Sequence, residues 1–106
     1  MIQNVAPANK LLGTITAPPD KSISHRAALF AAISDDVSVI DNFSEAADPQ
    51  STLGCLKSLG VNVEKQGKKV VIQGVGRRGL QIPSSPLDCG NSGTTMRLLS
   101  GIVAGA

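Results

Sequence analysis

Two short segments of the chain place small polar residues and a cation just before an apolar run. They are residues 20–26, Asp-Lys-Ser-Ile-Ser-His-Arg, and residues 88–97, Asp-Cys-Gly-Asn-Ser-Gly-Thr-Thr-Met-Arg. Acidic and hydroxyl residues in this place are typical of helix starts. A helix start leaves backbone N–H groups without partners and carries about half a positive charge, so it favours a bound phosphate or carboxylate. The sequence therefore predicts two anion-binding helix starts.

In the first segment, Lys21 supplies a compact positive charge. Ser22 and Arg26 are four residues apart and so share a helical face, where a hydroxyl and a bidentate guanidinium can meet one phosphate or carboxylate. His25 can face the same way, although a single histidine without an acid or metal partner is more often structural.

In the second segment, Gly90 and Gly93 permit close approach of a ligand or of another backbone. Asn91 and Thr94 add amide and hydroxyl groups. Arg97 lies on the adjoining helical face and is more often a structural partner of a carboxylate. Both segments also have a plainer interpretation, in which their hydroxyl groups only cap a helix.

The sequence gives little support for other kinds of catalytic, nucleotide-binding or metal site. There is no GxGxxG, Walker A, GxSxG or HExxH motif. Cys55 and Cys89 lack CxxC spacing and are expected to be small buried residues rather than metal ligands or a disulfide. The adjacent acids Asp35 and Asp36 fit a solvated helix end better than a catalytic pair.

Composition limits the classes of protein that need consideration. The chain has 106 residues, is 42% hydrophobic and carries a net charge of +2, which suits about one globular domain. With 2% aromatic residues and no basic run, a nucleic-acid surface is not expected. No segment has the length of a membrane span and the first residues lack a signal pattern, so a cytoplasmic protein without a membrane partner is expected.

The segments around these motifs predict an alternation of strands and helices. Alternating side chains predict a strand over Leu11–Ala17. A helix from Ser22 is expected to be buried nearly all round over Ala27–Ile33. A strand over residues 37–43 should follow, and then a helix with Asp48 as N-cap and Pro49 at its first position. The apolar face of that helix should be formed by Leu53, Leu56 and Leu59, with Gly60 ending it.

The second half predicts a hairpin, a loop and a third helix. Residues 61–64 and 69–73 form the hairpin around Gly67, and residues 74–79 form the loop. Residues 80–82 suggest a further strand, and a helix should begin near Ser92 with an apolar face continuing to Ala106. The expected order is β, α, β, α, β, β, followed by a new strand and helix. The chain is expected to be a piece of a longer protein.

The two motifs and the residues beside them resemble a known family. Residues 19–27, Pro-Asp-Lys-Ser-Ile-Ser-His-Arg-Ala, and residues 87–98, Leu-Asp-Cys-Gly-Asn-Ser-Gly-Thr-Thr-Met-Arg-Leu, are similar to two signatures of the 5-enolpyruvylshikimate-3-phosphate synthase family. The resemblance implies transfer of the enolpyruvyl group from phosphoenolpyruvate to the 5-hydroxyl of shikimate 3-phosphate. It implies addition and elimination through a tetrahedral intermediate, without a metal or organic cofactor.

The resemblance also implies which residues bind each substrate. Shikimate 3-phosphate would contact Lys21, Ser22 and Arg26. Phosphoenolpyruvate would contact Lys21 and lie against Gly93, with Asn91 and Thr94 nearby, and a side chain at position 93 would crowd both phosphoenolpyruvate and the herbicide glyphosate. No catalytic acid or base is assigned within the chain, because the family's proton-transfer residues are expected beyond Ala106.

The implied fold is α/β: a βαβαββ unit of the enolpyruvyl transferase fold, which resembles an inside-out α/β barrel, plus the start of a second unit. Residues 1–106 would form an N-terminal part of a two-lobed enzyme, with residues 1–18 in the other lobe and residues 19–106 in the N-terminal lobe. The remainder of the synthase, in the same chain or as a complementing chain, would be the protein partner.

Two alternatives stay open at the level of the sequence. One is a non-catalytic anion-binding or interaction module with the same fold. The other is the related transferase acting on UDP-N-acetylglucosamine, which is disfavoured because the Lys-Ser-x-Ser-x-Arg pattern of residues 21–26 differs from the Lys-Asn start of that relative.

Overall fold

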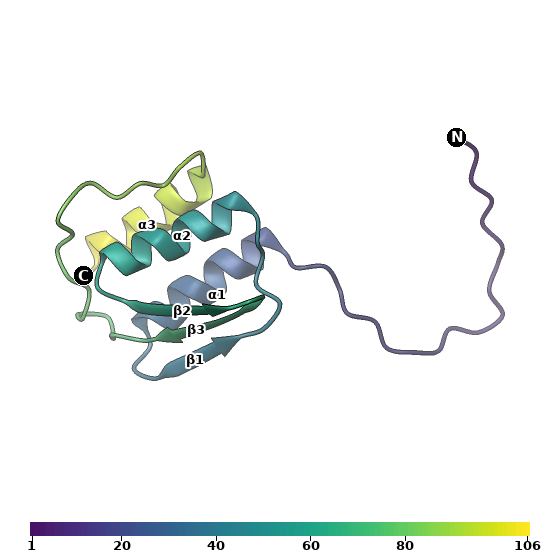
Figure 1. Cartoon of the computed structure of the whole chain (residues 1–106), viewed down its shortest axis with the longest axis horizontal. Helices are drawn as coiled ribbons and strands as arrows, with labels where there is room; N and C mark the ends of the chain where they lie inside the picture. The colour runs from purple at the N-terminus through teal and green to yellow at the C-terminus, as the bar shows by residue number, and fades with distance from the viewer.

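The computed structural model describes residues 1–106, and it contains one three-stranded sheet and three helices (Figure 1). Residues 1–20 form an extended segment that leads into the first helix. The elements in chain order are α1 (Lys21–Ile33), β1 (Val37–Ile40), α2 (Ala47–Ser58), β2 (Asn62–Gln66), β3 (Lys69–Gln73) and α3 (Gly93–Ala104). The predicted α/β class is confirmed. No helix is both long enough and apolar enough to cross a membrane.

The sheet has the strand order β1-β3-β2, and both outer strands run antiparallel to β3. β1 and β2 are therefore parallel to each other and are joined through α2 as a crossover helix. The predicted β2–β3 hairpin is confirmed, and Gly67 takes a φ of 64° in its turn. On one face of the sheet, Val70 and Ile72 are fully buried beneath the helices. Val37 and Val39 lie on the opposite face and are exposed.

The core lies between that face of the sheet and the helices. The predicted apolar face of α2 is confirmed, because Leu53, Leu56 and Leu59 are all buried. Gly60 follows α2 with a φ of 87°, which is the left-handed conformation expected just after a helix end. The core cluster comprises Ala28, Leu29, Ala31, Ala32, Phe43, Leu53, Cys55, Leu56, Leu59, Val61, Val63, Val70, Ile72 and Leu99.

Helix α1 begins where the sequence predicts but is buried on one side only. The Asp20 carboxylate caps it by accepting a hydrogen bond from the Ile23 N–H at 2.8 Å. Ala28 and Ala32 face the core and are fully buried, but Phe30 is 68% exposed. The prediction of a helix buried nearly all round was therefore wrong, because α2, α3 and the sheet leave the side of α1 that bears Phe30 uncovered.

Helix α2 begins before the predicted N-cap. Ala46 is the cap residue, with extended backbone angles and no side-chain hydrogen bond, and Asp48 and Pro49 lie inside the first turn. Proline is tolerated there because the first N–H groups of a helix have no partner within the helix. The prediction of Asp48 as N-cap was therefore wrong by two residues.

Two predicted strands and part of a third are absent. Residues 11–17 are exposed and have no strand partner, so their alternating pattern forms no sheet. Residues 80–82 also form no strand, although the Gln81 N–H donates to the Leu59 carbonyl at 2.8 Å. Strand β1 ends at Ile40, and Phe43 beyond it is a buried core residue outside the sheet.

Candidate anion-binding site

The three helices lie side by side and run in the same direction, so that their N-terminal ends gather at one end of the molecule (Figure 1). At this end the chain enters α1 from residue 20, α2 from residue 46 and α3 from residue 92. The partial positive charges of three helix dipoles therefore add at one place. Such an end favours multiply charged anions more than a single helix start does.

The first predicted cluster is exposed at this end. Ser22 and Arg26 are exposed on α1, and the Lys21 side chain, 61% exposed, lies with its Nζ 3.9 Å from Asp48 Oδ2. An ion pair this long and this solvated contributes less than about 1 kcal/mol to folding. Lys21, Ser22 and Arg26 are therefore accessible to a ligand from solvent.

Ser24, between these residues, has a structural place instead. It is buried, its hydroxyl donates to the Asp20 carbonyl at 2.7 Å, and its oxygen accepts a hydrogen bond from the Ser44 N–H at 3.0 Å. Ser24 thus ties the start of α1 to the segment that precedes α2.

The second predicted cluster surrounds the start of α3. The Ser92 hydroxyl caps this helix by accepting from the Thr95 N–H at 3.0 Å, and the Asp88 carboxylate accepts from the Gly90 N–H at 2.8 Å. Gly90 takes a φ of 57°, which favours glycine in this turn. The three residues of the cluster predicted to meet a ligand are all exposed: Asn91, Gly93 and Thr94.

Gly93 faces open space. A Cβ atom built on Gly93 would meet no other atom of the chain within 4 Å. The packing of this chain therefore gives no reason for a glycine here, and the space in front of it is free for a ligand. Arg97, one turn further along α3, is exposed and makes no ion pair with a carboxylate.

His25 does not share the surroundings of Ser22. It is 2% exposed, and its Nδ1 lies 2.7 Å from the Thr52 hydroxyl on α2. Burial lowers the pKa of His25 and the Lys21 charge adds to this effect, while the Asp48 carboxylate opposes it. The structural interpretation of this histidine is therefore the one that fits.

Sequence reasoning missed two residues on α2 at this end of the molecule. Asp48 was considered only as a cap, yet its carboxylate lies near Lys21, and Thr52 is fully buried against His25 and Thr95. A signal was present, because Asp48 and Thr52 are four residues apart and must share one face of a helix. The correct start of α2 was needed before that signal could be used.

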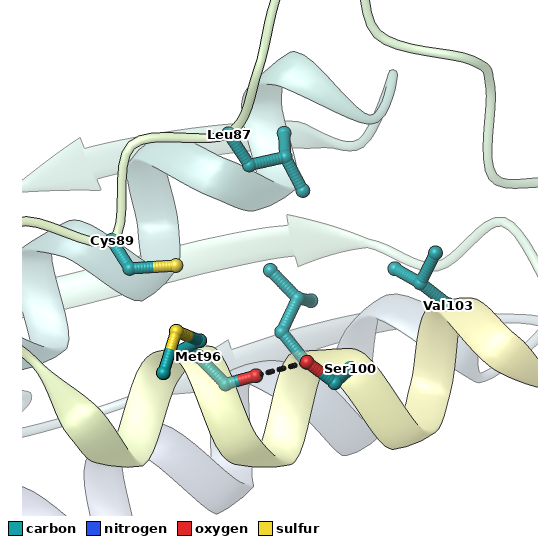
Figure 2. Close-up of a pocket in the computed structure, with 6 residues that line it drawn as sticks. Leu87, Cys89, Met96, Ser100 and Val103 are labelled. Atoms are coloured by element: carbon teal, nitrogen blue, oxygen red, sulfur yellow. Dashed lines mark hydrogen bonds between the residues drawn. The ribbon is translucent and has the colours of Figure 1, made fainter.

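An apolar hollow of about 240 Å³ lies along the side of α3 (Figure 2). Leu87, Cys89, Met96 and Val103 contribute to its lining, and the Ser100 hydroxyl beside it donates to the Met96 carbonyl within the helix. Because its lining is almost entirely apolar, this hollow is unsuited to a charged ligand. No group of acidic, histidine and cysteine side chains is placed to hold a metal ion.

Both cysteines carry free thiols, and Cys55 is buried. Its thiol lies 3.3 Å from the Asp88 carbonyl. Burial, the neighbouring Cys89 thiol and the Asp88 charge raise the pKa of Cys55 to about 11. Cys55 is therefore protonated at neutral pH and acts as a small core residue, as predicted.

The fold is an α/β unit in which three helix starts, with the exposed cations Lys21 and Arg26, gather at one end of the molecule. The family model for EPSP synthase (3-phosphoshikimate 1-carboxyvinyltransferase) matches residues 5–106. The chain therefore belongs to the EPSP synthase family.

Similar proteins agree with this membership. The chain is 53% identical over 106 residues to a 3-phosphoshikimate 1-carboxyvinyltransferase from Salinibacter ruber, matching 99% of this chain and 25% of the relative. It is 50% identical over 105 residues to the protein of the same name from a Roseiflexus species, with 99% and 24% covered. The chain thus spans about a quarter of the length of these curated relatives.

Solved structures give the same result for the fold. The structure of EPSP synthase from Acinetobacter baumannii superposes with a TM-score of 0.79 at 45% sequence identity, covering 85% of this chain and 21% of that one. The predicted fold class, a partial unit of this family's fold, is therefore confirmed.

Proposed function

We propose that a protein containing this chain transfers the enolpyruvyl group of phosphoenolpyruvate to the 5-hydroxyl of shikimate 3-phosphate, and that this chain supplies part of the substrate site. The observation that carries the proposal is the match of nearly the whole chain, at 50–53% sequence identity, to relatives named 3-phosphoshikimate 1-carboxyvinyltransferase. The gathered helix starts support it, because both substrates carry several negative charges.

The proposed reaction is an addition followed by an elimination. In the addition, the 5-hydroxyl gives up its proton to a base as its oxygen forms a bond to C2 of phosphoenolpyruvate, and C3 gains a proton from an acid. The bond from C2 to the phosphate oxygen then breaks, phosphate leaves, and C3 gives up a proton to restore the double bond. The groups of this chain bind and orient two anions, which reduces the entropic cost of bringing them together. We assign proton transfer to residues outside this chain and invoke no metal or organic cofactor.

The exposed residues at the helix starts divide between the two substrates in this proposal. Ser22 and Arg26 share one exposed face of α1, where they suit the phosphate of shikimate 3-phosphate, and Lys21 at the tip of the helix can serve both substrates. Phosphoenolpyruvate is assigned to the start of α3, next to Asn91, Gly93 and Thr94. The open space in front of Gly93 supports this assignment, and glyphosate would occupy the same place.

The same proposal divides the chain between two lobes. Residues 19–106 would form the first unit and the start of the second unit of one lobe, and residues 1–18 would join the other lobe. The exposure of residues 1–18 supports this division, and a hydrogen bond from the Asn42 amide to the Ala17 carbonyl ties down the end of that segment. Their alternating side chains would then find a sheet partner in the other lobe. The partner of this unit is the remainder of the synthase, whether it is part of the same chain or a complementing chain.

The test is a reaction assay on the complete protein that contains this chain. Phosphate release and formation of the enolpyruvyl product, followed by mass spectrometry, should both require phosphoenolpyruvate and shikimate 3-phosphate together. Equal release of phosphate when shikimate 3-phosphate is omitted, or turnover with UDP-N-acetylglucosamine instead, would reject the proposed reaction.

A further inference from the structure

A chain of buried side chains connects the start of α1 to the start of α3 through α2. His25 Nδ1 lies 2.7 Å from Thr52 Oγ1, and Thr52 Oγ1 lies 2.8 Å from Thr95 Oγ1. The Thr95 hydroxyl in turn donates to the Ser92 hydroxyl at 2.7 Å. The link thus runs from α1 to the residue that caps α3.

These contacts form one continuous set of hydrogen bonds. The Thr95 hydroxyl donates to the Ser92 hydroxyl at 2.7 Å and also lies 3.4 Å from the Asp48 carbonyl oxygen. Rotation of the hydroxyl groups and the tautomer of His25 set the direction of the Thr52–Thr95 and His25–Thr52 bonds. Every link has a donor and an acceptor, and no buried side-chain nitrogen or oxygen is left without a partner.

The burial of the two threonines makes this hydrogen-bonded link between the helices stiff. Thr52 and Thr95 are both fully buried, so water does not compete for their hydroxyl groups. Sliding or rotating α3 against α2 would break the hydrogen bond between these two buried hydroxyl groups without replacing it by one to water, which carries a free-energy penalty. The hydrogen bonds therefore fix the relative position of helices that are distant in sequence.

We infer that Thr52 and Thr95 are positioning residues that hold the anion-binding start of α3 in register with that of α1. This inference rests on the proposed function, because the register matters for a reaction in which one substrate is held at each helix start. Neither threonine touches a substrate in this assignment. They act through the Ser92 cap, which sets the orientation of the exposed N–H groups at the start of α3.

The test compares Thr52→Val, which keeps the shape and removes the hydroxyl, with Thr52→Ser, which keeps the hydroxyl, in the complete protein. For Thr52→Val, kcat should fall about tenfold, the effect expected when the hydrogen bonds of one buried hydroxyl are lost. The dissociation constant of shikimate 3-phosphate alone should stay within about threefold, because Lys21, Ser22 and Arg26 keep their places on α1. Thr52→Ser should restore most of kcat.

A second measurement does not depend on catalysis. Amide hydrogen exchange of residues 92–97 should become faster in Thr52→Val and return toward the original rate in Thr52→Ser. Ser58→Ala removes another hydroxyl of the same helix, at its far end, where Ser58 donates only to the Gly54 carbonyl. This control should change neither kcat nor the exchange of residues 92–97. Thr95→Val provides the same test from the other side of the bond.

The outcomes separate this inference from the proposed function. An unmodified protein without turnover would reject the proposed function, and hydrogen exchange would still report whether Thr52 holds the start of α3. An active protein whose Thr52→Val variant keeps kcat within twofold would overturn the inference. Equal loss of kcat in Thr52→Ser and Thr52→Val would also overturn it, because that result would assign the effect to packing rather than to the hydroxyl.

Discussion

Ser22 and Ser24 stand two residues apart on α1 and have opposite surroundings. Ser22 is exposed at the start of the helix, whereas Ser24 is buried and bonded to Asp20 and to the backbone N–H of Ser44. Their sequence context is almost the same, but the angle of about 100° per helical residue sends one side chain to solvent and the other to the core. Ser24 therefore has a structural role, whereas the exposed Ser22 hydroxyl is free for the contact with shikimate 3-phosphate that we propose.

We therefore expect opposite effects from the two alanine substitutions. Ser24→Ala should lower the free energy of unfolding by about 1–3 kcal/mol, because it leaves the buried Ser44 N–H without an acceptor. Ser22→Ala should change it by less than about 0.5 kcal/mol, as is usual for an exposed site, while weakening the binding of shikimate 3-phosphate. Urea unfolding and calorimetric titration of the complete protein measure the two effects. The reverse pattern would contradict this assignment.

His25 should make the stability of the protein sensitive to mild acid. Its pKa is lowered by burial and by Lys21, with Asp48 opposing, so the unfolded chain binds a proton more readily than the folded chain. The stabilising effect of the neutral imidazole is complete above the ordinary pKa of about 6.5 and is lost as the pH falls through the lowered value. The urea midpoint should fall between pH 7 and pH 5 more steeply than it does in His25→Asn. Equal slopes would show that His25 does not control this loss.

At the scale of single elements, the sequence predicts best where a local signal completes the element. The hairpin of β2 and β3, the start of α3 near Ser92 and the end of α2 at Gly60 all depend on neighbouring residues and are confirmed. The start of α2 was misplaced, because Asp48 and Pro49 are acceptable both at a helix start and inside a first turn. The predicted strand over residues 11–17 needs a partner strand, and no local pattern supplies one.

Two glycines provide a matched test of how these elements are packed. A Cβ at Gly54, on the exposed side of α2, would meet no atom within 4 Å, whereas a Cβ at Gly74 would collide with the carbonyl oxygens of Ser34 and Ala31. Gly54→Ala should raise the free energy of unfolding by about 0.5–1 kcal/mol, because alanine is the better helix former. Gly74→Ala should lower it by about 1–3 kcal/mol through backbone displacement. Chemical denaturation of both variants measures whether the free energy of unfolding rises or falls. A Gly74→Ala protein as stable as the unmodified one would contradict the close packing of Gly74 against Ser34 and Ala31.

At the scale of the whole molecule, the order of helices and strands and the two motifs were sufficient to predict the α/β class and the family. The buried link between the helix starts was not predictable from the sequence. It depends on His25, Thr52 and Thr95 meeting across three helices, and nothing in the spacing of three ordinary polar residues indicates that contact. The exposure of Phe30 was equally hidden, because it depends on which side of α1 the rest of the chain covers.

The isolated chain of 106 residues should associate with itself. Phe30, Val37 and Val39 are 68%, 58% and 57% exposed, and the apolar side chains of the extended N-terminal segment are exposed as well. Burial of such surface against a second copy is favourable. Sedimentation should show assemblies that grow with protein concentration and that diminish when the remainder of the synthase is added as a second polypeptide. A monomer that melts cooperatively at every concentration would contradict this expectation.

The most direct test of the central claim is the binding of shikimate 3-phosphate to the complete protein with one of two arginines removed. Arg26 lies among the gathered helix starts, and Arg77 lies in the loop beside Ile33, at the other end of α1; both are exposed. Arg26→Ala should weaken binding by about 10- to 100-fold, as expected for the loss of a charged hydrogen-bonding partner, whereas Arg77→Ala should change it by less than about twofold. Equal effects of the two substitutions in calorimetric titration would contradict the placement of the substrate at the helix starts.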